Sequence, residues 1–196
     1  MDRLSEVSAV ILAGGKSRRM GMDKALLQYQ RQSLLLRAIE FLTGLFPEVL
    51  VASCDPRRYP DLPVPCVPDE LPGEGALVGI HAGLKAAKNQ VVFVMACDHP
   101  FPQAELVRHL VQVAPDADLT IPSTARGFEP LFAVYGKTCL PFIALMVAEG
   151  ERRIRLLMDL VNARQINENE LRRFDPELAS FININTPDDL KAHTSL

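Results

Sequence analysis

The sequence predicts a three-layer α/β/α sandwich around one doubly wound, mainly parallel sheet. Short apolar runs of strand type alternate with stretches of helical spacing along the chain, and the run over residues 91–96 is continuously apolar. Alternating β and α elements with buried strands are typical of doubly wound folds. The chain has 196 residues, of which 48% are hydrophobic, and its composition does not shift sharply anywhere. We therefore expect a single domain over residues 1–196.

The first half of the chain predicts a strand-loop-helix unit followed by a proline-rich excursion. Residues 8–12 form a short apolar strand that stops at a glycine turn, and residues 33–46 have helical spacing with Ser33 as N-cap. A second strand covers residues 48–52. The prolines between residues 55 and 72 forbid a long helix and leave room for one short strand, residues 64–67.

The second half continues the alternation. A helix over residues 76–88 precedes the strand over residues 91–96, which we expect in the middle of the sheet because it is apolar on both faces. The remaining expected elements are a helix over 102–113, strands over 119–122 and 130–135, helices over 139–148 and 154–161, a strand over 181–184 and a closing helix after Pro187.

Charge and composition exclude several classes of protein. The 21 Lys+Arg and 24 Asp+Glu give a net charge of −3 without a long basic run, which argues against nucleic acid as a partner. No apolar run approaches the roughly 20 residues that cross a bilayer, and no signal peptide is recognisable, so we expect a cytoplasmic protein without a membrane partner. The 4 cysteines lack zinc-ligand spacing and are expected to be reduced core thiols.

A glycine-rich basic loop follows the first strand. Residues 12–24 read Leu-Ala-Gly-Gly-Lys-Ser-Arg-Arg-Met-Gly-Met-Asp-Lys, at the sheet edge where open α/β folds bind ligands. Small residues let backbone N–H groups approach an anion, and the cations neutralise it, so a polyphosphate fits better than the alternative of a solvated loop. A P-loop is excluded because Val10 stands where its first glycine is needed, and the adjacent Gly14 and Gly15 do not match GxGxxG.

Asp98 is a second candidate, because it directly follows the apolar strand at the same sheet edge. A carboxylate there can hold Mg²⁺, which takes one or two carboxylates and completes its shell with phosphate and water. Helix capping is the alternative role. His99 is expected to face solvent, while His81, His109 and His193 are expected on the surface. The charged run 151–155 is interpreted as a solvated face, with a binding site as the alternative.

Taken in order, five segments resemble the molybdenum cofactor guanylyltransferase (MobA) family of nucleotidyltransferases. They are residues 12–27 (LAGGKSRRMGMDKALL), Pro68-Asp69-Glu70 with residues 75–79 (GALVG), residues 96–101 (ACDHPF), residues 129–135 (EPLFAVY) and residues 181–190 (FININTPDDL). The similarity covers almost the whole chain, and the order of the segments is more specific than the first alone. It implies a Rossmann-like sheet of the glycosyltransferase-A-like nucleotidyltransferase fold.

The resemblance also implies roles for individual residues. The catalytic groups would be Arg19, Lys24 and Asp98; the nucleotide would contact Leu12, Ala13, Gly14, Gly15, Lys24, Ser53, Asp69 and Asp98; Asn183 and Asn185 would lie beside the pterin; and Asp98 would bind Mg²⁺. Asp69 is expected in the guanosine pocket and Lys24 at the phosphates. The role of Glu129, which stands where some relatives carry a histidine, is left open.

The implied reaction is a Mg²⁺-dependent transfer of GMP from GTP to the phosphate of a molybdopterin-type cofactor, with release of pyrophosphate. That phosphate is already anionic, so positioning and charge neutralisation suffice without a protein nucleophile. Two alternatives stay open: a nucleotidyltransferase of the same fold that uses CTP or a sugar phosphate, and a non-catalytic nucleotide- or cofactor-binding protein. Transient contact with proteins that supply or insert the cofactor is also open.

Overall fold

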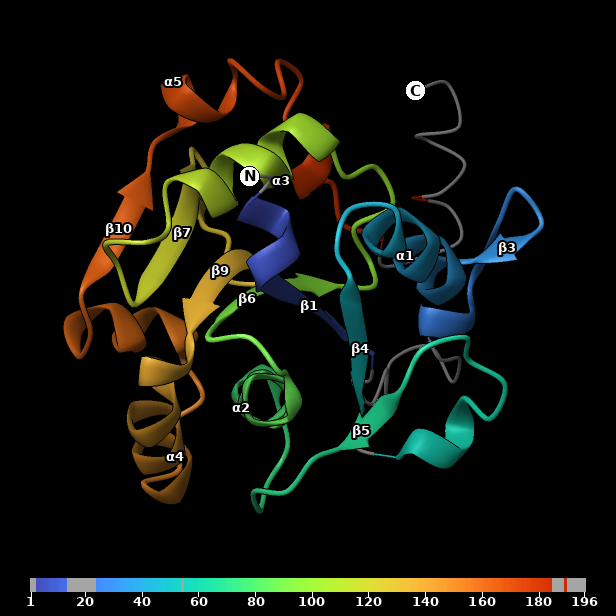
Figure 1. The fold of residues 1–196 in the computed structure, drawn as a ribbon, viewed down its shortest axis with the longest axis horizontal. Helices are drawn as coiled ribbons and strands as arrows, with labels where there is room; N and C mark the ends of the chain where they lie inside the picture. Colours follow the sequence, from blue (N-terminus) through green and yellow to red (C-terminus); the bar gives the residue numbers. More distant parts are fainter. Residues whose placement is uncertain (1–2, 14–23, 54, 185–188, 190–196) are drawn as a thin grey trace.

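A computed structural model of the chain describes residues 3–13, 24–53, 55–184 and 189 (Figure 1). The described strands of the main sheet are β1 (Val7–Leu12), β4 (Glu48–Ser53), β5 (Cys66–Pro68), β6 (Val91–Ala96), β7 (Leu119–Thr124), β8 (Gly127–Phe128), β9 (Phe132–Gly136) and β10 (Ala163–Ile166). The described α-helices are α1 (Leu34–Thr43), α2 (Ala76–Ala86), α3 (Ala104–Gln112), α4 (Leu140–Ala148) and α5 (Glu168–Leu171).

The main sheet has the strand order β10-β7-β9-β6-β1-β4-β5, with β8 paired to β7. β1 pairs in parallel with β4 and β6, and β5 adds in parallel to β4. β9 is antiparallel to both of its neighbours, β6 and β7, while β10 is parallel to β7. The expected mainly parallel sheet is therefore confirmed, with β9 and the short β8 as its antiparallel members.

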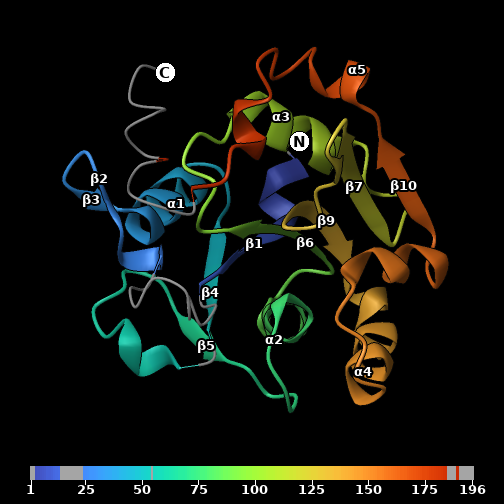
Figure 2. The ribbon, with the colours of Figure 1, turned by 180° about the vertical axis from the view of Figure 1, so that it is seen from behind.

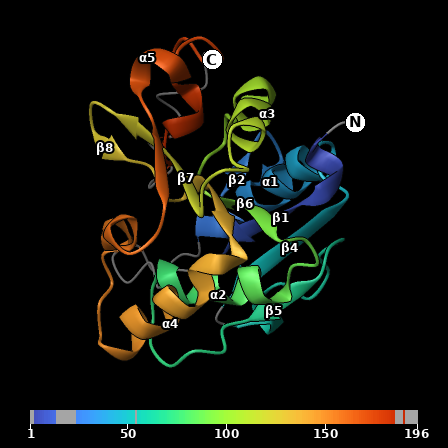
Figure 3. The same ribbon diagram turned by 60° about the vertical axis from the view of Figure 1, so that its left-hand side comes forward.

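Helices cover both faces of this sheet, as Figures 1 and 3 show: α1 and α3 lie on one side, and α2 and α4 lie on the other. The alternation of side chains along β1 explains the arrangement. Ala9 and Ile11 pack in the core shared with α1 and α3, whereas Val10 packs in the core shared with α2 and α4. Both faces of β1 are thus buried, which is why its sequence is continuously apolar.

Helix α2 approaches β1 very closely at Gly83. A Cβ atom built on Gly83 would lie 2.4 Å from Cγ1 and 2.9 Å from Cγ2 of Val10. Valine is stiff at χ1 and sits on a strand with neighbours on both sides, so it cannot rotate away. Only glycine fits at this helix position without moving the helix or the strand.

We expect Gly83→Ala to destabilise the fold, although alanine is the better helix former. Overpacking a core costs about 1–3 kcal/mol, and a contact this short belongs at the upper end, above the roughly 1 kcal/mol that helix propensity returns. Urea unfolding measures the difference. The double variant Val10→Ala/Gly83→Ala should lose less than the sum of the two single variants. A Gly83→Ala protein as stable as the wild type would contradict this packing.

Most predicted elements agree with the structure to within a few residues, and α1 begins as expected. Its N-cap is Ser33, whose Oγ accepts a hydrogen bond of 3.3 Å from the backbone N–H of Leu36. The proline-rich excursion contains the 3₁₀ turn Pro56–Arg58 and the short strand β5. The described strands and α-helix that the sequence did not predict are the hairpin of β2 (Gln28–Tyr29) and β3 (Gln32–Ser33), β8, β10 and α5.

Two predicted elements are wrong. Residues 154–161 form the 3₁₀ helix Ile154–Asp159, in which Leu157 is the one buried residue, so no apolar stripe supports an α-helix. Residues 181–184 are not a strand: the 3₁₀ helix Ala179–Phe181 leads into irregular backbone. There the N–H of Ile184 donates to the carbonyl of Asp98 at 3.0 Å. The predicted closing helix lies outside the described residues except for position 189.

The thiols of Cys97 and Cys139 are free and buried, which confirms their assignment to the core, whereas Cys66 is only half-buried. Burial raises the pKa of Cys139 to about 12, so its thiolate is disfavoured near neutral pH. Cys54 lies outside the described residues. Within the described part of the chain, no helix is both long enough and apolar enough to cross a bilayer.

Candidate active site

The carboxyl ends of three strands are joined by backbone hydrogen bonds at one edge of the sheet. β1 lies between β6 and β4, an order that can be followed in Figure 2. The N–H of Ala13 donates to the carbonyl of Ala52 at 2.9 Å, and the N–H of Cys97 donates to the carbonyl of Leu12 at 3.2 Å. Leu12 and Ala13, both predicted nucleotide contacts, therefore lie between the end of β4 and the turn that carries Asp98.

Lys24 and Asp98 meet at this edge. The Nζ atom of Lys24 lies 3.9 Å from Oδ2 of Asp98, with side-chain exposures of 32% and 23%. Two residues predicted as catalytic groups from distant segments are thus side by side and open to a ligand. Gly14, Gly15 and Arg19, the other predicted residues of the basic loop, lie outside the described residues.

Asp69 follows β5 and has an unsatisfied buried atom. Its Oδ1 has no hydrogen-bond partner among the described residues, and burial raises the pKa of its carboxyl group. A Cβ built on Gly79, in the first turn of α2, would lie 3.9 Å from that oxygen and 3.3 Å from Cδ2 of Leu12. Buried acceptors normally have donors, so the orphaned oxygen indicates a place for a ligand N–H beside Leu12.

Ser53, predicted near the nucleotide, ends β4 at the same edge and pairs in register with Pro68 of β5. Its side chain is buried, and its Oγ accepts a hydrogen bond of 3.3 Å from the N–H of Asp55. The hydroxyl thus stabilises its own turn, and a contact with nucleotide stays a prediction.

The predicted pterin segment lies against the turn that carries Asp98. Asn183 is exposed and directly precedes Ile184, whose N–H is held by the carbonyl of Asp98. The irregular backbone at 182–184 thus brings Asn183 close to the Lys24–Asp98 pair, although no strand pairing holds it there. Asn185 lies outside the described residues.

The solvent-facing orientation predicted for His99 is wrong. The residue is 3% exposed, its ring packs against Phe132, and its Nδ1 lies 2.8 Å from the carbonyl oxygen of Ser180. Burial lowers the pKa of the imidazole. A proline follows His99 in the chain, but the turn directs the ring inward, where it joins the Asp98 turn to the segment that leads to Asn183.

Two other histidines, His81 and His109, also differ from the surface positions predicted for them. His81 is buried on α2. His109 on α3 lies 2.8 Å from Oε1 of Glu170 and stacks on the ring of Phe174 with centroids 4.1 Å apart. These partners lie far away in the sequence, which is why single-sequence spacing did not reveal them. His193 lies outside the described residues.

The charged run 151–155 is consistent with a solvated face. The side chain of Arg153 donates to both carboxylate oxygens of Glu151, and these bonds hold the pKa of Glu151 at about 2. Arg152 and Arg153 also donate their backbone N–H groups to Glu151. The carboxylate of Glu151 is therefore bonded to its neighbours in the chain, Arg152 and Arg153.

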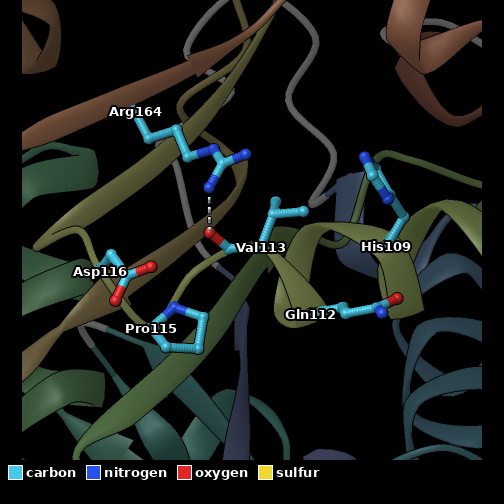
Figure 4. Close-up of a pocket in the computed structure, with 6 residues that line it drawn as sticks. All are labelled: His109, Gln112, Val113, Pro115, Asp116 and Arg164. Carbon is cyan, nitrogen blue, oxygen red and sulfur yellow. Dashed lines mark hydrogen bonds between the residues drawn. The ribbon is translucent and has the colours of Figure 1, made fainter.

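Two cavities are lined by residues other than Lys24 and Asp98, and the larger one includes His99, which directly follows Asp98. One of about 360 Å³ (Figure 4) is at the amino end of β7, the opposite end of the sheet. There Arg164 donates to the carbonyl of Val113 at 3.1 Å. The other, of about 780 Å³, lies between α1 and the segments 99–103 and 175–179. None of the residues predicted for the site lines either cavity.

Comparison with known proteins shows the family to which the chain belongs. The family model described as the MobA-like NTP transferase domain matches residues 9–166. The chain belongs to this family. The match begins in β1, ends with β10, and includes Lys24, Asp69 and Asp98.

Relatives of the MobA-like family align over nearly the whole chain. The probable molybdenum cofactor guanylyltransferase of Methanosarcina mazei is 38% identical over 197 residues, covering 94% of this chain and 88% of that protein. The molybdenum cofactor guanylyltransferase of Syntrophotalea carbinolica is 35% identical, covering 94% and 89%. The crystal structure of molybdopterin-guanine dinucleotide biosynthesis protein A from Archaeoglobus fulgidus superimposes with a TM-score of 0.84 at 29% identity, covering 94% of this chain and 95% of that one.

Two charged residues of the MobA-like domain lie next to the segment that leads to Asn183. Arg126, at the turn between β7 and β8, donates to the carbonyl oxygen of Phe181. Glu129 lies 3.7 Å from the same guanidinium. The segment 129–135 had marked Glu129 through the resemblance, but no sequence pattern marks Arg126, because its partner is 55 residues away.

Proposed function

We propose that this chain transfers GMP from GTP to the terminal phosphate of molybdopterin, forming the guanine dinucleotide cofactor and releasing pyrophosphate. Membership of the MobA-like family and the names of its relatives support the reaction class. The observation that carries the proposal is the position of the Lys24–Asp98 pair at the sheet edge, with the orphaned oxygen of Asp69 after β5 and with Asn183 next to the residue that is bonded to the Asp98 carbonyl.

On the nucleotide side, we assign the base edge to Asp69. Guanine offers N1–H and the N2 amino group as adjacent donors, and a carboxylate accepts from both. Leu12 and Ala13 would line the base and ribose, while Lys24 would neutralise the phosphates. We assign Gly14, Gly15 and Arg19 to the same phosphates on the grounds of sequence.

Asp98 fits a Mg²⁺ site that the substrate completes. Its carboxylate is partly exposed, and the described residues contain no group of three or more His, Cys, Asp or Glu side chains that could hold a metal ion by themselves. Mg²⁺ commonly binds through one or two carboxylates together with substrate phosphates and water. When bound, it would supply positive charge that stabilises the transferring phosphoryl group.

The protein groups position the reactants and neutralise charge. Lys24 would hold the nucleotide phosphates in place, and the segment at Asn183 would orient the acceptor so that its phosphate lies in line with the α-phosphorus. No proton has to be removed from an anionic phosphate, so a general base is not required. His99 would not serve as one, because its ring is buried against the carbonyl of Ser180.

We also propose that the reaction takes place in the cytoplasm, where GTP is abundant. Transient contact with proteins that supply the cofactor or insert the product belongs to the same proposal, and pull-down with such proteins would test it.

Thermal denaturation with a panel of nucleotides tests the proposed function at the binding step. A ligand at about 100 times its Kd stabilises by about 2.7 kcal/mol, which raises Tm by about 5–10 °C in a domain of this size. We expect this shift for GTP with Mg²⁺, and a smaller one for ATP, CTP or GTP without the metal. Equal shifts for all nucleotides would contradict the proposal.

Removal of the Lys24 charge should weaken GTP far more than guanosine. A charge-assisted contact contributes about 1.5–3 kcal/mol, so Lys24→Ala should raise the Kd of GTP by about 10- to 100-fold and leave guanosine unchanged. Calorimetry with both ligands measures this, and Arg19→Ala is expected to behave in the same way.

A matched control for the lost charge is Lys88→Ala. Lys88 is exposed and pairs with Glu48 at the amino end of β4, far from the strand ends that carry the site. It should bind both ligands like the wild type. Equal losses for GTP and guanosine in Lys24→Ala would assign Lys24 a structural role instead.

A further inference from the structure

Glu129 is a half-buried carboxylate at the carboxyl end of the central strands. It lies just before β9, where the N–H of Ala96 donates to the carbonyl of Leu131 at 2.9 Å, so Glu129 is only a few residues beyond the end of β6. Its side chain is 14% exposed. Burial raises the pKa of its carboxyl group, as it does for Asp69.

Only one of the two oxygens of Glu129 is engaged. Oε1 accepts a hydrogen bond of 3.3 Å from Oγ1 of Thr124 and lies 3.7 Å from Nη2 of Arg126, too far for a direct hydrogen bond. Oε2 makes no hydrogen bond with any other residue in the described ranges. A carboxylate that served only to anchor Arg126 would be expected to make the closer, two-pronged contact that arginine favours.

The environment of Glu129 connects it to the acceptor side of the site. Arg126 holds the carbonyl oxygen of Phe181, which begins the segment that leads to Asn183. The same segment is attached to the Asp98 turn through Ile184. In the strand order, Glu129 thus belongs to the β9 side of the Lys24–Asp98 pair, and Asp69 belongs to the β5 side.

We propose that Glu129 determines specificity for the acceptor by accepting hydrogen bonds from the pterin ring. The inference deepens the proposed function and rests on it. A pterin carries N3–H next to a 2-amino group, which is the same pair of adjacent donors that guanine presents through N1–H and its N2 amino group. The site then recognises two similar heterocycles with one carboxylate each, Asp69 for the nucleotide and Glu129 for the acceptor.

The variant Glu129→Gln tests this role through the two Michaelis constants. Gln keeps the shape of the side chain, but presents only one acceptor atom. We expect the KM for molybdopterin to rise about tenfold or more, because a recognised donor is left unpaired, while the KM for GTP stays within twofold. The matched control is Glu168→Gln. Oε2 of Glu168, on α5, accepts a hydrogen bond from the N–H of Ala125, which lies in the turn that carries Arg126. It should leave both constants unchanged.

Competition with pterin fragments provides a second readout. 6-Hydroxymethyllumazine carries a carbonyl group in place of the 2-amino group of 6-hydroxymethylpterin. The wild type should be inhibited at least tenfold more strongly by the pterin, and Glu129→Gln should lose that preference. If Glu129→Gln does not fold, the inhibition of the wild type by the two fragments is the test. Equal inhibition by the pterin and the lumazine then overturns the inference.

The outcomes separate this inference from the proposed function. A wild type that transfers GMP to molybdopterin, with a Glu129→Gln variant of unchanged acceptor KM and unchanged pterin preference, overturns the role of Glu129 alone. An equal rise of the acceptor KM in Glu168→Gln assigns the effect to the turn and also overturns it. A wild type that transfers no GMP to molybdopterin overturns both proposals.

Discussion

Asp98→Asn is expected to lower turnover by about 10²- to 10³-fold, the loss typical of removing one charge-stabilising group from an active site. The amide has the same shape as the carboxylate, so the fold should remain intact. What disappears is the negative charge 3.9 Å from Lys24 and the hard oxygen ligand that suits Mg²⁺. The measurement is kcat at saturating GTP and molybdopterin, together with the concentration of Mg²⁺ that gives half-maximal rate.

The control for Asp98→Asn is Asp61→Asn, which makes the same chemical change at an exposed position of the proline-rich excursion. It should have wild-type turnover. Both variants should unfold at the wild-type temperature, because the backbone of Asp98, through its carbonyl, makes the contact with Ile184. Turnover of Asp98→Asn within threefold of the wild type would remove Asp98 from the reaction centre.

The second large effect concerns the base. We expect GTP to be preferred over ATP and CTP by at least about tenfold in kcat/KM, with ITP intermediate because it lacks the N2 amino group. Each buried group left unpaired costs about 1–3 kcal/mol. The orphaned oxygen of Asp69 supplies the acceptor, so Asp69→Asn should reduce the difference between GTP and ITP to near zero. Glu70→Gln, at the exposed neighbour that pairs with Lys85, should keep it.

The same carboxyl group predicts a pH dependence. Burial raises the pKa of Asp69 above that of an ordinary aspartate. The ionised form accepts from both guanine donors, whereas the protonated form has lost one acceptor. The preference for GTP in kcat/KM, which reports groups of the free enzyme, should therefore be present above the raised pKa and be lost as pH falls through it. A preference that is constant down to the ordinary aspartate range would contradict this assignment, and a preference for CTP would indicate the cytidylyl branch.

The fold was predictable where local pattern and tertiary burial agree. β1 and β6 are continuously apolar because both of their faces are covered, and Ser33 caps α1 through a contact only three residues away. β10 was missed because Arg164 and Gln165 are exposed, so that a short edge strand lacks an apolar run. Residues 181–184 read as a strand, yet their partner is the carbonyl of Asp98 instead of a sheet neighbour.

The candidate site follows the same rule. Lys24, Asp69 and Asp98 stand at strand ends or in a marked motif, so their sequence positions indicated the site, and the structure brings Lys24 and Asp98 together. The inward position of His99 and the role of Arg126 depend on carbonyl groups of Ser180 and Phe181, which are 81 and 55 residues away. Such contacts leave no pattern in a single sequence, because Ser180 and Phe181 belong to an irregular segment without helix or strand periodicity. Only the resemblance to the family connected this segment to the site.

The most direct test of the central claim is the identity of the product. The purified protein is incubated with molybdopterin, Mg²⁺ and an equimolar mixture of GTP, CTP and ATP, and the dinucleotide forms are quantified by mass spectrometry together with pyrophosphate. We expect the guanine dinucleotide to predominate by at least about tenfold, with one pyrophosphate released for each dinucleotide formed. A predominant cytosine dinucleotide, or GTP consumption that yields no dinucleotide, would contradict it.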